Sequence, residues 1–456
     1  MNNIIKKAVL LSTSVAVSLG LGAYAGDRYY TEREDLEVEF QKRDFNKPSA
    51  SSKPAASIKQ PQNFVNRNSV NQASAARGFV RENYLRDFEP RFDFDIPGLN
   101  FAQQKSVSFS FPVKANQVMD FSSKQAHAQS REFSMEVTGQ ELKRGINLKT
   151  SAPGALVRIS SFDGVSAVEP DQLSLVVGGN GLNKIQFDRG SAFETLVDSQ
   201  TMQKTGMGFQ RGTTGFKIAK QMGKGQFQLK TQQNLASNAR YKLNVFEKDS
   251  DTELHLTADK SAYLKNEVLS VNAKMWQQGK AHQLASIKGL LRSPAGQVLP
   301  VSFNKQGQAK LPLRMQRANR PGELWTLETQ VEAMVNGQKI LREARVAFAY
   351  SDKTAKLAMS KPNIIASGNR LHSSIPVRAF KDGRYEVRAV LYATNNKGVK
   401  VPAMVTHSAS DLAAGYGLIQ MNFDQALLAK SGLKAPFELR NLQLRDQRQM
   451  AVLELK

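Results

Sequence analysis

The chain of 456 residues contains no cysteine, and this absence excludes several kinds of chemistry. Without a thiol there is no disulfide, no nucleophilic cysteine, no thiolate metal site and no lipid attachment through cysteine. Histidine is scarce as well, and no two of the five residues have metal-ligand spacing. The sequence therefore predicts neither a metal nor another cofactor. The five are His127, His255, His282, His372 and His407.

Familiar catalytic motifs are also missing. The sequence has no H-E-x-x-H, no G-x-S-x-G and no phosphate-binding glycine loop followed by G-K-[ST]. Lys204-Thr205-Gly206 and the Ser431/Lys434 pair match parts of penicillin-binding motifs. Their order is reversed and no Ser-Asp-Asn lies between them, so we interpret both matches as chance.

The strongest apolar run lies at the N-terminus. Lys6 and Lys7 precede the apolar stretch 8–21, and Ala23-Tyr24-Ala25 has the small-x-small pattern of a cleavage site. We predict a Sec-type signal peptide over residues 1–25, which implies export to the periplasm or the exterior. No transmembrane segment would remain after cleavage. An uncleaved anchor is the alternative, disfavoured because Gly and Ser dilute the apolar run.

Residues 26–92 have little periodic apolar character. The stretch 46–76 is rich in Ser, Ala, Pro, Asn and Gln. Such a composition buries too little surface to offset the entropy of ordering, so we predict a disordered leader. A cluster of Phe79, Val80, Tyr84, Leu85 and Phe88 is either part of a linker or a short docking motif.

Residues 93–248 alternate apolar and polar side chains in several short runs. Val107, Phe109 and Phe111 alternate with serines, and Val157 and Ile159 lie in a run that follows a Pro-Gly turn. Period two is typical of half-buried strands, and turn signals separate the runs. We expect these strands to form a β-rich, sandwich-like N-terminal domain.

Residues 252–351 and 353–456 have the same pattern, each over about 100 residues, the size of an immunoglobulin-like sandwich. Asn336-Gly337 between two alternating runs predicts a tight hairpin. Trp325 shares a strand face with Leu327 and Val331 and is expected in the core. Arg342 stands in phase with the apolar residues of the return strand. The predicted fold class is therefore all-β, with two immunoglobulin-like sandwiches after the N-terminal domain.

The third unit carries one helix signal and one irregular strand. Asp424 and Gly432 predict the bounds of a short helix. Leu439 and Leu442 are out of phase on what otherwise reads as one strand, which indicates a β-bulge.

Several segments resemble a known family. They include S-A-P-G-A-L-V-R-I-S in the first unit, R-P-G-E-L-W-T-L-E in the second and D-G-R-Y-E-V-R-A-V-L-Y-A-T-N-N-K-G in the third. Over about residues 100–456 the chain is similar to an uncharacterised family of gammaproteobacterial exported proteins, a domain of unknown function with C-terminal immunoglobulin-like domains. The resemblance implies export, through a type II secretion route, and supplies no catalytic residue.

The net charge of +23 favours an anionic partner. One candidate anionic-ligand patch lies between residues 211 and 230, where phenylalanines alternate with basic residues. The competing interpretation is a hairpin with phenylalanines inside and lysines outside. The candidate residues are Arg211, Lys217, Lys220, Lys224 and Lys230.

The joint between the first two units carries the charged segment Glu247–Asp251. Asp249 and Asp251 are candidate calcium ligands. Lys248 and Lys260 disfavour the site by placing positive charge near it, and hard cations need several oxygen ligands. A solvated linker is the preferred interpretation.

The preferred function is binding, without catalysis, by an exported protein. The partner would be an anionic surface polymer, a glycan or a protein, and nucleic acid is disfavoured. The alternative is a secreted hydrolase whose active site lies in the N-terminal domain, with the two sandwiches as accessory modules. A deep cleft with converging carboxylates or histidines would favour the hydrolase.

Overall fold

The computed structural model describes residues 105–177, 185–187, 192–204, 208–315, 322–358, 362–368 and 370–456. The predicted signal peptide and the predicted leader lie outside these residues. The described chain is all-β, as the periodicity predicts, and its strands gather around three separate hydrophobic cores. None of its helices is long and apolar enough to cross a membrane.

The N-terminal domain is a two-layer sandwich. One sheet has the order β4-β10-β6-β7, and the other runs β3-β11-β5-β9-β8. Leu148 and Phe227 from the first sheet share a core with Ile159 and Phe216 from the second, so the two sheets pack face to face. The elements are β3 (Glu132–Thr138), α2 (Gly139–Arg144), β4 (Ile146–Thr150), β5 (Leu156–Ser161), η1 (Pro170–Gln172), β6 (Leu173–Val177), β7 (Ile185–Phe187), β8 (Phe193–Val197), α4 (Ser199–Lys204), β9 (Thr213–Ile218), η2 (Lys220–Met222), β10 (Gly225–Thr231) and β11 (Arg240–Phe246).

The central domain is a second sandwich. One sheet runs β15-β14-β12-β2 with β18 also on β14, and the other runs β17-β16-β19-β20 with β13 parallel to β20. The elements are β2 (Ala126–Ser130), β12 (Thr252–Ala258), β13 (Ala262–Leu264), β14 (Val268–Gln277), β15 (Lys280–His282), β16 (Leu284–Arg292), β17 (Val298–Val301), β18 (Gln308–Pro312), β19 (Trp325–Val335) and β20 (Gln338–Ser351).

Two local predictions in the central domain are confirmed. Asn336 and Gly337 both have positive φ, 50° and 74°, and join β19 to β20 in a two-residue hairpin. Trp325 is 2% exposed and belongs to the central core. It packs edge-to-face on Tyr350, with ring centroids 5.5 Å apart.

The C-terminal domain is the third sandwich. Its larger sheet runs β1-β25-β24-β27-β28. In its smaller sheet β23 pairs with β26 on one side and with β21 and β22 on the other. The elements are β1 (Val107–Pro112), β21 (Ala355–Leu357), β22 (Ile365–Ser367), β23 (Arg370–Ala379), β24 (Gly383–Thr394), β25 (Lys400–Leu412), β26 (Gly415–Phe423), α5 (Gln425–Ser431), β27 (Lys434–Asp446) and β28 (Ala451–Leu455).

The predicted helix and bulge of this domain are also confirmed. The side chain of Asp424 accepts a hydrogen bond from the backbone of Leu427 at 3.1 Å, and Gly432 ends the helix in the left-handed conformation. The register between β24 and β27 shifts beside Asn441, whose φ is 54°.

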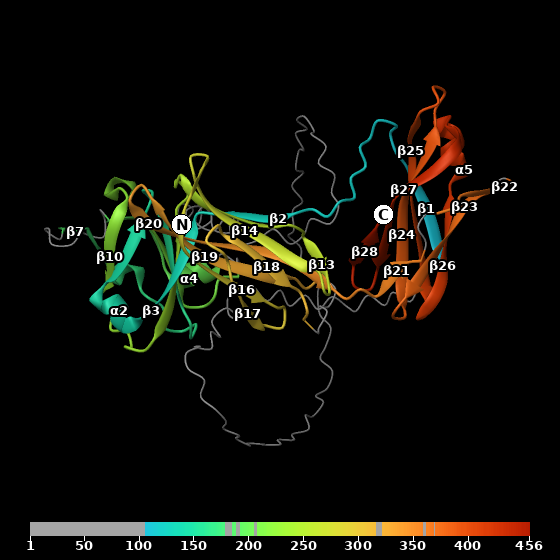
Figure 1. Cartoon of the computed structure of the whole chain (residues 1–456). Coiled ribbons are helices and arrows are strands. Elements are labelled where there is room, and N and C mark those ends of the chain that lie inside the picture. The colour runs from blue at the N-terminus through green and yellow to red at the C-terminus, as the bar shows by residue number, and fades with distance from the viewer. Residues whose placement is uncertain are drawn as a thin grey trace, which may run out of the picture. The chain divides into compact units, whose positions relative to one another are not determined.

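The strand at Val107–Phe111 forms, but not where the sequence analysis assigns it. β1 pairs with β25 of the C-terminal domain, so the expectation that these residues pack in the first unit is wrong. Figure 1 shows β1 in cyan among the orange and red strands of that domain. The apolar face also points outward, since Phe109 and Phe111 are 48% and 54% exposed.

The inward face of β1 is made of hydroxyl groups. The Ser108 side chain hydrogen-bonds that of Ser408, and the Ser110 side chain that of Thr406, both at 2.8 Å. Period two fixes which side chains share a face, whereas the partner strand decides which face turns inward.

The strand before β3 also leaves the N-terminal domain. β2 pairs with β12 of the central domain, from Ala126 opposite Ala258 to Ser130 opposite Leu254. The segment 105–130 therefore supplies an edge strand to each of the other two sandwiches. A strand assignment from sequence alone has no access to such long-range pairing.

Candidate functional site

The N-terminal and central domains are joined by backbone pairing as well as by the chain itself. β3 and β20 pair at a single position, Glu132 opposite Glu343, which makes one sheet continuous across both domains. Like charges directly opposite one another are unfavourable. The Glu343 carboxylate is compensated by hydrogen bonds from the Ser134 hydroxyl, 2.7 Å, and the Gln330 amide, 2.9 Å.

A buried polar group, which we call the junction cluster, lies beside this pairing. It consists of Ser151, Glu247, Ser250, Thr252 and Arg342. Glu247 and Ser250 lie between β11 and β12, and both are buried, at 1% and 3% exposure. The interpretation of Glu247–Asp251 as a solvated linker is therefore wrong for these two residues. They face the interior because Arg342, 1% exposed, provides the partner that a buried carboxylate needs.

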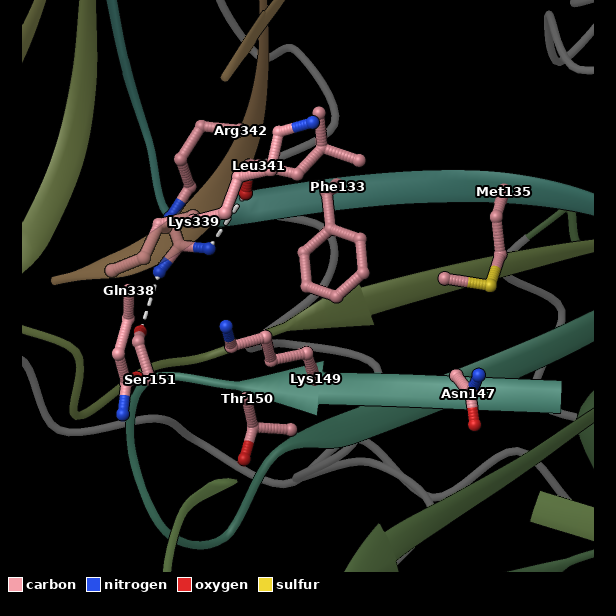
Figure 2. A pocket seen from close by; sticks show the side chains of 11 residues that line it. Phe133, Met135, Asn147, Lys149, Thr150, Ser151, Gln338, Lys339, Leu341 and Arg342 are labelled. Atoms are coloured by element: carbon pink, nitrogen blue, oxygen red, sulfur yellow. Dashed lines mark hydrogen bonds between the residues drawn. The ribbon is translucent and has the colours of Figure 1, made fainter. Parts of the chain in front are cut away.

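Arg342 binds five groups. Its Nη2 donates to Glu247, to the Ser151 hydroxyl at 2.8 Å and to the Ser250 hydroxyl at 3.0 Å. Its Nε donates to the carbonyl of Thr252 at 3.1 Å, and its Nη1 to the carbonyl of Leu341 at 2.8 Å. Figure 2 shows the guanidinium group between Leu341 and Ser151.

The carboxylate of Glu247 also has several hydrogen-bond donors. It accepts hydrogen bonds from the backbone nitrogen and the hydroxyl of Ser151, each at 2.6 Å. Burial lowers the pKa of Arg342, and the charge of Glu247 opposes that shift. Desolvation offsets much of the attraction within a buried ion pair, whereas removal of one partner leaves an uncompensated buried charge.

A small pocket opens next to the junction cluster. Its volume is about 120 Å³. Figure 2 shows the side chain of Lys149 extending from β4 toward Ser151 and Arg342. The lining residues are Phe133, Met135, Asn147, Lys149, Thr150, Ser151, Gln338, Lys339, Ile340, Leu341 and Arg342.

The residues that line this pocket provide hydrogen-bond donors and positive charge. Lys149 and Lys339 are exposed at it, and Lys339 also pairs with Glu332 at 2.7 Å. No lining residue is a carboxylate or a histidine. The pocket could hold one small anion or one side chain, but the described lining has no acid–base pair of the kind that hydrolases use.

The structure brings together two of the five candidate anion-binding residues. Lys217 on β9 and Lys220 in η2 both pack against Gly154. Each has an acidic partner: Lys217 pairs with Glu194, and Lys220 pairs with Asp249 at 3.0 Å. Their charges are therefore partly compensated.

The other three candidate residues lie apart from this pair. Arg211 lies near Gly164 in a turn, Lys224 is exposed before β10, and Lys230 lies on β10. The competing interpretation is wrong about the hairpin, because β9 and β10 belong to different sheets. Its side-chain pattern is confirmed: Phe216 and Phe227 are buried in one core, and the lysines of the two strands and of the segment between them are exposed or half-buried. Whether any of the five residues binds an anion stays a prediction.

The suggested calcium ligands have protein partners. Asp249 pairs with Lys220, and Asp251 accepts hydrogen bonds from the side-chain amides of Gln277 and Gln278 at 3.0 and 3.3 Å. Within the described ranges no group of three or more acidic or histidine side chains has an arrangement that could hold a metal ion.

Local sequence patterns did not predict the junction cluster, although one residue gave a signal of it. Arg342 stands in phase with Ile340, Ala344 and Val346, all of which are buried. A charged residue on the apolar face of a predicted strand requires a buried partner. The identity of that partner was hidden, because Glu247 lies 95 residues away.

Comparisons with known proteins support the same three-part architecture. Models of the N-terminal, central and C-terminal domains of DUF4785, a domain of unknown function, match residues 100–247, 250–351 and 354–456. A crystal structure of a DUF4785 family protein from Legionella pneumophila is 22% identical, with a TM-score of 0.60. The match covers 77% of this chain and 92% of that one, and shows a shared fold.

More distant structural matches carry no functional argument. A marsupial T cell receptor (8% identity, 64% of this chain, 99% of that chain) has a TM-score of 0.17. A β-glucosidase from Streptomyces venezuelae is 11% identical, and the match covers 77% of this chain and 49% of that chain, with a TM-score of 0.18. No curated protein matches the chain. The chain therefore carries, in order, all three domains of the DUF4785 family.

Proposed function

We propose that this protein is an exported binding protein of gammaproteobacterial type that recognises an anionic surface partner and has no catalytic activity of its own. Export follows from the signal-peptide pattern of residues 1–25, and a type II route is the path that the family resemblance implies. The net charge of +23 favours an anionic partner.

The pocket beside the junction cluster is the observation that favours binding over hydrolysis. Its volume of about 120 Å³ lies below the range of roughly 300–1,000 Å³ typical of small-molecule sites. A hydrolase in the N-terminal domain would need a cleft with converging carboxylates or histidines, and this pocket has neither. The lining of this pocket therefore supports binding rather than hydrolysis at the junction cluster.

The test compares turnover with binding. The chain without residues 1–25 is incubated with fluorogenic glycoside, ester, peptide and phosphate-ester substrates, and separately sedimented with insoluble anionic and neutral polymers at low salt. We expect no turnover above the buffer rate and retention by anionic polymer only. Turnover that survives repurification and disappears in a variant of the N-terminal domain would establish the hydrolase alternative instead.

A further inference from the structure

The smaller sheet of the C-terminal domain has an unusual charge composition. Its four strands β21, β22, β23 and β26 contain no Asp and no Glu, but carry Lys356, Arg370 and Arg378. All three cations are exposed. The larger sheet of the same domain is different, since it contains carboxylates that pair with neighbouring bases, such as Asp411 with Arg384 at 2.7 Å.

We call the face of this sheet that carries the exposed Lys356, Arg370 and Arg378 the acid-free face. The strand register concentrates positive charge at one end of it. Lys356 lies directly opposite Arg378, and on the other side of β23 Tyr416 lies opposite Arg378. Like charges in directly opposed positions destabilise a sheet. Neither cation has an ion-pair partner among the described residues. The fold therefore retains an electrostatic cost that an anionic ligand would relieve.

Two aromatic rings flank the guanidinium group of Arg378. Its Cζ lies 5.8 Å from the ring centroid of Phe380 and 5.6 Å from that of Tyr416. Such contacts hold the group in place while its donors stay available for a planar anion. Tyr416 and its neighbour Leu418 are 77% and 62% exposed, which is a large apolar area to leave in water.

The middle of the acid-free face consists of groups that hydrogen-bond but carry little charge. Ser374 lies opposite Gln420, to which its hydroxyl donates at 2.7 Å, and His372 lies opposite Asn422. Arg370 follows at the far end. Eight residue steps separate Arg370 from Arg378, or roughly 26 Å at the usual rise of a strand.

We propose that the acid-free face binds an acidic polysaccharide, an inference that rests on the proposed binding function and names its ligand class and surface. The low charge density of the face argues for this occupant. Each strand of duplex DNA carries a charge about every 3.4 Å of helix axis, so roughly eight phosphates of one strand would meet three cations over this length. Anionic membranes attract clusters of about 4–8 basic residues, more than the face holds.

A chain of sugars with sparse carboxylates satisfies each part of the surface. A carboxylate forms a bidentate contact with Arg378, as planar anions do with a guanidinium group. Tyr416 offers a ring face against which the apolar face of a sugar packs. Hydroxyl groups along the chain meet the amides of Gln420 and Asn422.

The experiment uses the chain without residues 1–25 and measures binding of hyaluronate, which carries a carboxylate on every second sugar, with dextran as the neutral probe. The variants are Arg378→Gln and Tyr416→Ala. Lys310→Gln, an exposed lysine on β18, and Phe111→Ala, an exposed aromatic on β1, are the matched controls. We expect hyaluronate binding without dextran binding, about a tenfold loss of affinity in each variant, and less than about a twofold change in the controls.

The outcomes separate this inference from the proposed function. Hyaluronate binding that is equal in all forms overturns the assignment to this face and leaves the binding function intact. Stronger binding of single-stranded oligothymidine or of phosphatidylserine vesicles, weakened by the same two variants, overturns the ligand class. Absence of hyaluronate binding by any form overturns the inference, and the binding function then rests on the polymer sedimentation described above.

Discussion

Arg342 and Arg378 occupy opposite environments in the same chain. Arg342 is buried and donates to five protein groups, with Glu247 as its counter-ion. Arg378 is exposed, has two aromatic rings for neighbours, and lies on a sheet without a single carboxylate. The comparison separates a charge used to define the architecture from a charge available to a ligand.

The physical difference lies in where each charge is compensated. A buried guanidinium must find its partners within the protein, because an unpaired charge in the interior is too costly. An exposed guanidinium is compensated by water, and so the absence of a carboxylate near it costs little in isolation. The unusual feature at Arg378 is the opposed Lys356, which adds repulsion that the fold could have avoided.

The largest expected effect comes from breaking the junction cluster. Glu247→Gln leaves Arg342 buried without a counter-ion, so we expect unfolding to become easier by about 3–5 kcal/mol. Urea denaturation followed by circular dichroism measures this change. Glu332→Gln, which removes an exposed ion pair with Lys339, is the control and should cost less than about 1 kcal/mol. Equal losses in the two variants would contradict a structural role for the cluster.

A comparable loss is expected from a core position away from both arginines. Trp325→Ala should destabilise the central domain by about 3–5 kcal/mol, the usual range for a buried large aromatic. Hydrogen exchange should show lost protection at Val331 and Val346, while Ile159 in the N-terminal core keeps its protection. Simultaneous loss at Ile159 would mean that the continuous sheet and the junction cluster unfold both domains as one unit.

Replacing both members of the buried pair should cost less than removing one. In the double variant Glu247→Leu, Arg342→Leu no unpaired charge remains, although the carbonyls of Thr252 and Leu341 lose their donor. We expect a residual loss of about 1–3 kcal/mol, the cost of leaving buried polar groups unsatisfied. Urea denaturation compares it with the single variants Glu247→Leu and Arg342→Leu. A loss of unfolding free energy in the double variant equal to the sum of the two single losses would argue against pairing between the two residues.

Arg378→Gln should leave stability almost unchanged, within about 0.5 kcal/mol, because the side chain is exposed and has no carboxylate partner. Thermal unfolding provides the measurement. A large loss of stability would place Arg378 with Arg342 as an architectural residue and remove the contrast between them.

The smallest expected effect is the change of binding affinity and of unfolding free energy with salt concentration. Binding of an anionic polymer should weaken steadily as salt rises, because exposed charges are screened beyond about 8 Å at physiological ionic strength. The stability contributed by the junction cluster should respond far less, since buried pairs are screened little. Affinity and unfolding free energy measured over the same salt series give both slopes, and a salt-independent affinity would reject an electrostatic mechanism.

The sequence alone determined the local features of this protein. Alternation located most strands, Asn336-Gly337 defined the hairpin, and Asp424 with Gly432 marked the ends of α5. Burial of Trp325 followed from the strand face that it shares with Leu327. These features depend on residues close together in the chain, so backbone preferences and period-two patterning are sufficient to predict them.

Only the tertiary structure decided which strands meet. It turned the serines of β1 inward and its phenylalanines outward by pairing β1 with β25 some 300 residues away. It brought Glu247 to Arg342, and it assembled the acid-free face from strands spread over residues 355–423. Strand pairing is a choice among many compatible partners, made by the packing of whole sheets, and no local pattern encodes the result.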